Sequence, residues 1–231
     1  MTKKGSFGAV VRAAFPHTIP ILTGYLAVGV AYGVLMAAKG YNFLWAGFIS
    51  GFAFCGSMQY VAITLLTTVF DPVQAFLLSL MVNARHLFFS LSVLPKYRGL
   101  GKVKYFLIYT LADEQFSLAT TVEPPEDMEP SRFYFALHFM TWCYWVLASM
   151  LGGLAGSFIT FDTTGIDFAL TALFVVLFME QVLKKENRAG GAIGLVCSVA
   201  GLAAFGADNM VIPAMIFTLA VLLLGRKKLC A

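Results

Sequence analysis

The stretch FLLSLMVNARHLFFSLSVL, residues Phe76–Leu94, indicates what class of protein this is. It is apolar over about the 20 residues that a membrane-spanning helix needs. Asn83, Arg85 and His86 nevertheless lie in its middle. A guanidinium at the centre of a spanning helix costs roughly 2.5–3.5 kcal/mol or more, so it is rare there without a partner or a task. The stretch therefore predicts a helical membrane protein with a polar site at membrane depth.

The rest of the chain has the same character. Hydrophobic residues make up 59% of the 231 positions and charged residues 12%, and the mean hydropathy is +0.81. Soluble domains carry about 25% charged residues. Eight apolar segments can be drawn, at 18–38, 43–69, 72–94, 105–122, 134–159, 165–183, 189–206 and 209–225. Because backbone groups in lipid must be satisfied internally, each segment is expected to be helical.

We therefore predict an all-α polytopic membrane protein, a bundle of seven to eight transmembrane helices. Residues 1–231 are expected to form a single transmembrane transporter domain. Clusters of Lys and Arg before the first segment, at 184–188 and at 226–228 are typical of cytoplasmic ends of spans. The partner that the composition requires is the lipid bilayer, in a multi-pass arrangement.

Glycines interrupt two of the apolar segments. Gly51 and Gly56 lie inside 43–69, and a G-G-L-A-G run lies inside 145–161. Transporters often break or turn helices at such places around a binding site, so both segments are candidates for broken or re-entrant helices. The other interpretation is close helix packing, because glycines recur four residues apart. These pairs are Gly29/Gly33, Gly47/Gly51, Gly152/Gly156 and Gly190/Gly194.

Several function classes find no support in the sequence. The four cysteines are scattered without a C-x-x-C spacing, and no H-E-x-x-H occurs, so we expect neither a metal site nor a cofactor. No phosphate-binding G-x-x-x-x-G-K-[ST] motif occurs, so nucleotide hydrolysis is not expected. No nucleic-acid-binding module is recognisable. Ser57 and His86 could form a hydrolase dyad, but no motif or third partner supports an enzyme.

The polar residues within the apolar segments suggest a site for a zwitterion. Arg85 is expected to bind a carboxylate, and Asp113 or Glu114 an ammonium or a proton. An amino acid is the smallest common solute that carries both charges. The substrate-binding candidates are Arg85, Asn83, Gln59, Ser57, Gly56, Asp113 and Glu114.

Proton coupling is a second hypothesis for the same residues. Histidine is the side chain whose ordinary pKa lies nearest neutral pH, so His86, with Asp113 and Glu114, could couple transport to protons. Asn83 and His86 are three residues apart and share a helix face. Two alternatives remain open: Arg85 could form a structural ion pair with Asp113 or Glu114, and His86 could be a hydrogen-bonded core histidine.

An ordered set of segments resembles the AzlC family, the large subunits of bacterial branched-chain amino-acid exporters. The resemblance covers nearly the whole chain. It differs from the expected pattern at Phe54-Cys55 and at Ala112. The matching segments are P-I-L-T-G-Y-L-A-V-G-V-A-Y-G, F-A-F-C-G-S-M-Q-Y, N-A-R-H-L-F-F-S-L-S-V-L-P, A-D-E-Q-F-S-L-A, G-G-L-A-G-S-F and G-I-D-F-A-L-T-A-L-F.

The resemblance implies a permease of the bacterial inner membrane that exports valine, leucine, isoleucine and also methionine. It implies a small hydrophobic AzlD-type membrane subunit as partner. By motif it carries functional roles to Gln59, Asn83, Arg85, His86, Asp113 and Glu114. A transporter for a different small solute and a non-transporting membrane assembly subunit are the alternatives.

Overall fold

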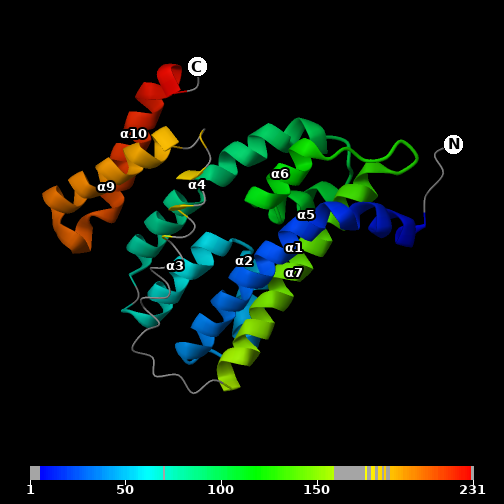
Figure 1. The fold of residues 1–231 in the computed structure, drawn as a ribbon, viewed down its shortest axis with the longest axis horizontal. Helices are drawn as coiled ribbons and strands as arrows, with labels where there is room; N and C mark the ends of the chain where they lie inside the picture. Colours follow the sequence, from blue (N-terminus) through cyan, green and yellow to red (C-terminus); the bar gives the residue numbers. More distant parts are fainter. Residues whose placement is uncertain are drawn as a thin grey trace. The chain divides into compact units, whose positions relative to one another are not determined.

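The structure is a computed structural model, and every element in the part of the chain that it describes is helical (Figure 1). The described residues are 6–69, 71–158, 175, 178–179, 182–183, 185 and 188–229. Within the helices, the side chains of Arg85, Phe88 and residues 207–209, 211–212 and 226–229 lie outside the described part. The expectation of an all-helical protein is confirmed over these residues.

The chain divides into two compact units. Unit 1 comprises Met1–Asp71 and Val82–Thr163, and unit 2 comprises Pro72–Met81 and Thr164–Ala231. The residues of the candidate site all belong to unit 1. A single transporter domain over residues 1–231 stays a prediction.

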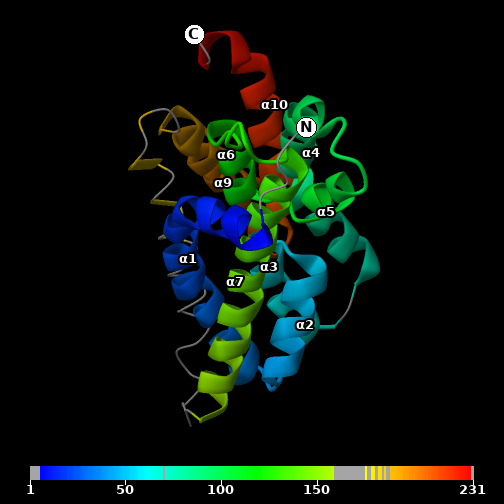
Figure 2. The ribbon, with the colours of Figure 1, turned by 90° about the vertical axis from the view of Figure 1, so that its right-hand side faces the viewer.

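Two long helices form the centre of unit 1. Helices α1 (Phe7–Ala38) and α7 (Pro130–Phe158) lie side by side along their length (Figures 1 and 2). A Cβ on Gly29 would lie 2.7 Å from the Cβ of Ala148, and a Cβ on Gly33 would collide with the backbone of Ser149 and Gly153. The packing interpretation is therefore confirmed for the Gly29/Gly33 pair.

The glycines of α7 have the same role. A Cβ on Gly152 would collide with the backbone of Val30, and a Cβ on Gly156 would lie 2.8 Å from the Cβ of Ala37. Because α7 runs unbroken to Phe158, the G-G-L-A-G run does not break the helix, and the broken-helix interpretation is wrong for the described part of this segment, 145–158. The described surroundings of Gly190 and Gly194 place nothing within 4 Å of an added Cβ, so close packing is not seen at that pair.

The segment 43–69 is broken, as its glycines predict. Helix α2 (Phe43–Ala53) ends at Phe54, and helix α3 (Gly56–Thr67) begins after Cys55. Phe54 has a φ of +23°, so the chain leaves the helical path through a backbone conformation that side chains rarely adopt. We call Phe54 and Cys55 the first break.

A second break was not predicted. The segment 105–122 was expected to be one spanning helix, but it forms α5 (Val103–Tyr109) and α6 (Asp113–Thr121). Residues 110–112 separate them, and Ala112 has an extended backbone. We call residues 110–112 the second break. It directly precedes the acidic pair Asp113 and Glu114.

Helix α4 (Pro72–Tyr97) carries the N-A-R-H stretch, residues 83–86, which contains Asn83, Arg85 and His86. In unit 2, α9 (Arg188–Asn209) packs on α10 (Val211–Leu229), where a Cβ on Gly201 would lie 3.0 Å from that of Ala214. The predicted segment 165–183 lies largely outside the described residues.

The expected seven to eight spans are not confirmed. Over the described residues, three helices are long and apolar enough to cross a membrane: α1, α7 and Arg188–Gly206 of α9. Helix α4 would make a fourth. Two of the missing spans have a physical reason: the two breaks divide 43–69 and 105–122 into helices of 7 to 12 residues. At about 1.5 Å per residue, such helices are too short to cross a hydrocarbon layer of about 30 Å alone.

Candidate functional site

A hydrogen-bonded group, here called the first polar cluster, joins α1, α6 and α7. It consists of Tyr25, Glu114, Gln115 and Thr141. The Tyr25 hydroxyl donates to Glu114 Oε2 at 3.0 Å, and Gln115 Nε2 donates to Thr141 Oγ1 at 2.9 Å. The Tyr25 hydroxyl also lies 3.4 Å from Gln115 Nε2. Tyr25, Gln115 and Thr141 are buried, so this cluster is a polar centre within an apolar bundle.

The second polar cluster lies where α2, α3 and α7 meet. It consists of Ser50, Gln59, Trp145 and Ser149, which are all buried. Trp145 Nε1 donates to Gln59 Oε1 at 2.8 Å, and Gln59 Nε2 donates to Ser50 Oγ at 2.8 Å. Ser50 Oγ in turn donates to Ser149 Oγ at 2.8 Å. The predicted site residue Gln59 is thus held by both functions of its amide.

An aromatic contact connects the two clusters. The rings of Tyr25 and Trp145 meet edge to face, with centroids 5.0 Å apart. On another side of the indole, a Cβ on Gly56 would lie 3.2 Å from Trp145 Cη2. Gly56, predicted to contact substrate through its backbone, therefore also allows the start of α3 to approach Trp145 closely.

The two helix breaks are close to each other in space. The carbonyl oxygen of Gly51, in the last turn of α2, accepts hydrogen bonds from the Tyr109 hydroxyl and, at 3.1 Å, from Trp142 Nε1. In a continuous helix this carbonyl would accept from the amide of Cys55. Because the first break removes that donor, the last residue of α5 and a side chain of α7 take its place.

The N-A-R-H stretch, residues 83–86 of α4, contacts the first break through Asn83. Asn83 Oδ1 accepts a hydrogen bond from the Cys55 thiol at 2.8 Å. His86 Nδ1 lies 3.2 Å from the backbone oxygen of Asn83, which confirms that Asn83 and His86 share a face of α4. The Arg85 side chain lies outside the described part of the structure, so its role as carboxylate ligand and its pairing with Asp113 or Glu114 stay predictions.

The acidic pair begins α6. Asp113 and Glu114 occupy the first turn of this helix, where the helix dipole favours negative charge. Both are partly buried, and Asp113 Oδ1 is shielded from solvent. Ser57 is partly buried in the first turn of α3. The structure therefore brings Glu114 and Gln59 into polar clusters and places Gly56 against Trp145 of the second cluster.

Six residues of the two clusters are not among the site candidates predicted from the sequence: Tyr25, Ser50, Gln115, Thr141, Trp145 and Ser149. A signal was present in α7, because Thr141, Trp145 and Ser149 recur every four residues and so share one face of the helix. Such a polar stripe within an apolar helix indicates a buried polar surface.

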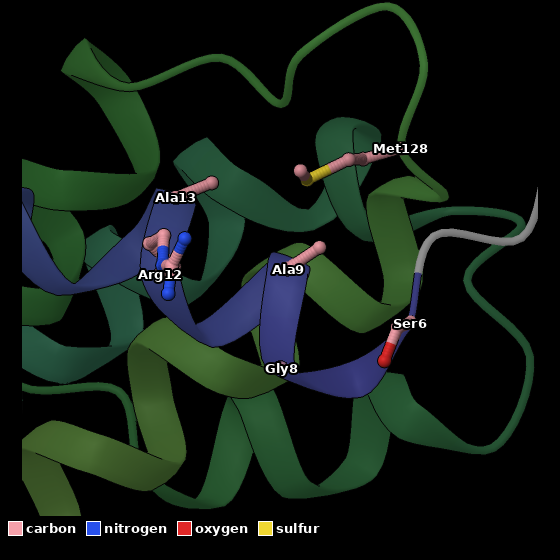
Figure 3. A pocket seen from close by; sticks show the side chains of 6 residues that line it. All are labelled: Ser6, Gly8, Ala9, Arg12, Ala13 and Met128. Atoms are coloured by element: carbon pink, nitrogen blue, oxygen red, sulfur yellow. The ribbon is translucent and has the colours of Figure 1, made fainter.

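A cavity of about 590 Å³ lies away from these clusters, beside the N-terminal end of α1 (Figure 3). Its lining residues are Ser6, Gly8, Ala9, Arg12, Ala13 and Met128. Arg12 is the charged side chain of this lining, and it is exposed. None of the predicted site residues lines this cavity.

An ion pair links α4 to the loop after α6. Lys96 Nζ donates to Glu123 Oε1 at 2.8 Å and to the backbone oxygen of Ala119 at 2.5 Å. The hydrogen bond from Lys96 lowers the pKa of the exposed Glu123 carboxyl below its usual value. This pair ties the end of α6 to α4 outside the apolar segments.

The arrangement has the chemistry of a site for a small zwitterion. Glu114 and Asp113 provide negative charge at one break, and the first-turn amides of α3 provide donors at the other. The two hydrogen-bonded clusters and the aromatic rings of Tyr25 and Trp145 connect these ends. Broken helices whose termini face a polar centre are the usual means by which transporters hold charged solutes.

Comparison with known proteins identifies the family. The family described as AzlC protein matches residues 20–159. The chain is 43% identical over 229 residues to the branched-chain amino acid transport protein AzlC of Bacillus subtilis (strain 168), covering 99% of this chain and 90% of the relative. It is 38% identical to an uncharacterized membrane protein of Helicobacter pylori (strain ATCC 700392 / 26695), covering 94% and 96% of the two chains.

A more distant relative is the inner membrane protein YgaZ of Escherichia coli (strain K12), which is 25% identical over 81% of this chain and 79% of its own. No solved structure matches the chain. Relatives named as membrane proteins and the apolar helices place the chain in a membrane. With the family matched over more than half of its length and a close relative along nearly all of it, the chain belongs to the AzlC family.

Proposed function

We propose that this protein is the large subunit of a secondary transporter that exports branched-chain amino acids across the bacterial inner membrane. Valine, leucine and isoleucine are the expected substrates, with methionine as a further one. The observation that carries the proposal is the first polar cluster, which places Glu114 at the start of a broken helix beside Tyr25. The B. subtilis relative, named as a branched-chain amino acid transport protein, supports the substrate class.

In this proposal the substrate binds between the two breaks. Its ammonium is held by Glu114 and Asp113 at the start of α6. Its carboxylate is held by Arg85, with Asn83 and the first-turn groups of Gly56 and Ser57. Gln59 orients the start of α3 through its bonds to Trp145 and Ser50. Alternating access then requires the helices on either side of the breaks to move about this site.

The experiment is labelled-leucine counterflow in proteoliposomes. We compare the wild type with Glu114→Gln, which keeps the size of the side chain and removes its charge, and with Glu126→Gln in an exposed loop as the matched control. Hydrogen bonds to a charged group contribute about 1.5–3 kcal/mol. A loss of about tenfold or more in leucine affinity is therefore expected for Glu114→Gln and none for Glu126→Gln. Leucine flux in Glu114→Gln at the wild-type affinity would contradict the assigned role.

Arg85 needs a separate variant. Arg85→Ala in a protein that still folds is expected to abolish leucine counterflow, because the substrate carboxylate loses its charge partner. If Arg85→Ala prevents folding or assembly but Arg85→Gln, which keeps a hydrogen-bonding side chain without the charge, folds and transports with unchanged affinity, the role of Arg85 is structural.

The proposal includes proton coupling through His86, Asp113 or Glu114. Intramembrane ionisable residues are characteristic of proton-coupled transporters. Outward leucine flux from loaded vesicles is expected to fall when a protonophore collapses the proton gradient. Unchanged flux would remove proton coupling from the proposal while leaving amino-acid transport intact.

A small AzlD-type membrane subunit is the proposed partner. Counterflow is expected to require both proteins, and the two should copurify. Absence of leucine flux even with the partner present would favour another small solute or a non-transporting assembly role.

A further inference from the structure

We propose that His138 is a positioning residue: it fixes the second break and thereby sets where Asp113 and Glu114 stand. This inference rests on the proposed function, because it concerns the same acidic pair. His138 lies on α7 and is 1% exposed.

Both ring nitrogens of His138 are engaged by hydroxyl groups. Nε2 lies 3.0 Å from the hydroxyl of Tyr97 at the end of α4, and Nδ1 lies 2.9 Å from Thr110 Oγ1. Thr110 is the first residue of the second break. The imidazole therefore connects α7 to the break on one side and to α4 on the other.

The hydroxyl protons determine the direction of these hydrogen bonds. Thr110 Oγ1 lies 2.8 Å from the backbone oxygen of Phe106 and donates its one proton there. It can then only accept from His138, so Nδ1 carries a proton. A neutral imidazole leaves Nε2 to accept from the Tyr97 hydroxyl. The three residues thus form a chain in which every donor has an acceptor, and Thr110 is held in one orientation.

Helix α7 holds the chain on both sides of the break. One turn after His138, Thr141 accepts from Gln115 at 2.9 Å. His138 therefore fixes the residue that begins the break, and Thr141 fixes the third residue of α6. Asp113 and Glu114 lie between these two fixed points. Because Leu111 is buried and Ala112 is extended, the intervening backbone has little freedom to absorb a shift of Thr110.

The test distinguishes the hydrogen bond that Nδ1 donates from the space that the imidazole ring fills. His138→Asn places an amide donor near the position of Nδ1, whereas His138→Leu fills the space without a donor. Thr110→Val removes the acceptor at nearly constant volume. His17→Leu, the same change at an exposed histidine of α1, is the matched control. Each protein is reconstituted with its partner, and leucine counterflow gives KM and the maximal rate.

We expect His138→Leu and Thr110→Val to raise the KM for leucine by about tenfold. This is the effect of weakening the contact between the acidic pair and the substrate by about one hydrogen bond. The maximal rate per folded complex should change less. His138→Asn should recover most of the affinity, and His17→Leu should match the wild type. A folded His138→Leu protein with wild-type KM, or equal losses in His138→Asn and His138→Leu, would overturn the assignment.

A second measurement does not depend on leucine being the substrate. Tyr25→Phe and Glu114→Gln are combined in a double-mutant cycle, with the apparent melting temperature as readout. The shifts should be non-additive in the wild type, because the two side chains share a hydrogen bond, and additive in the His138→Leu background. Equal coupling in both backgrounds would overturn the positioning role. Absence of leucine flux in the wild type would instead count against the proposed function alone.

Discussion

The contact between α1 and α7 depends on residues that have no side chain. At Gly33, an added methyl group would meet the backbone of Ser149 and Gly153, which cannot rotate away as a flexible side chain could. We therefore predict that Gly33→Ala forces the two helices apart and destabilises the folded protein by about 1–3 kcal/mol. Thermal unfolding in detergent measures this as a lower melting temperature.

Gly24 is the matched control on the same helix. A Cβ there meets nothing within 4 Å, and the residue is exposed. Since alanine is favoured over glycine in helices by about 1 kcal/mol, Gly24→Ala should leave the stability unchanged or raise it. A Gly33→Ala protein as stable as Gly24→Ala would show that the helices do not approach as closely as described.

The indole N–H of Trp145 provides a second residue-level prediction. It donates to Gln59 Oε1, and both residues are buried. Trp145→Phe keeps an aromatic ring beside Tyr25 but leaves the amide oxygen without this donor. A buried acceptor left unsatisfied costs about 1–3 kcal/mol, so a lower melting temperature is expected. Combining Trp145→Phe with Gln59→Leu, which removes the acceptor as well, should restore part of the loss; a further full loss would contradict the pairing.

At the scale of the elements, the Gly51 carbonyl joins the ends of α2 and α5 with α7. Tyr109→Phe and Trp142→Phe each remove one of its two donors. Each single change should cost about 0.5–1.5 kcal/mol, and the double variant should cost more than their sum, because the carbonyl then loses both donors. The melting temperatures of the four proteins give this cycle. Strict additivity would indicate that the two donors do not share the carbonyl as a common acceptor.

The ion pair between α4 and the loop after α6 predicts a dependence on pH. Hydrogen bonding from Lys96 lowers the pKa of Glu123 in the folded protein. A group with a lowered folded pKa contributes stability at pH values above its unfolded pKa, near 4.5. That contribution is lost as the pH falls toward the folded value. The melting temperature of the wild type should therefore fall more steeply with acidification than that of Glu123→Gln. Glu126→Gln, an exposed acid of the same loop, should follow the wild type.

For the whole molecule, substrate binding should be visible as stabilisation. A ligand at about 100 times its Kd adds about 2.7 kcal/mol to the stability of the protein that binds it. Leucine should raise the melting temperature of the complex with its partner, and 4-methylpentanoate, which lacks the ammonium group, should not. Glu114→Gln should reduce the shift with leucine. Equal shifts with both compounds would contradict an ammonium site at the acidic pair.

The sequence determined the class of the protein and the composition of its candidate site. Apolar segments of spanning length forced helices, because a backbone in lipid must satisfy its own hydrogen bonds. The three-residue spacing of Asn83 and His86 inside such a segment predicted that they share one face of α4. The glycines of 43–69 made this segment a candidate for the first break. The order of motifs identified the family, which the comparisons confirmed.

Only the tertiary structure decided which helices are continuous and which polar residues meet. Glycine spacing is the same for a helix break and for a close helix contact, so the sequence left both interpretations open for 145–161, and only the structure shows that Gly152 and Gly156 pack against α1. The second break carries no glycine. Its first residue, Thr110, is held by His138, and Gln115 just after it is held by Thr141, both on another helix. Tyr25 and Trp145 have apolar rings with a single polar atom, and only their neighbours show whether that atom is used. The hydrogen bonds of Tyr25 and Trp145 and the glycine contacts between α1 and α7 join residues about 90 to 120 positions apart. Local sequence patterns do not show which residues that far apart in the chain come into contact.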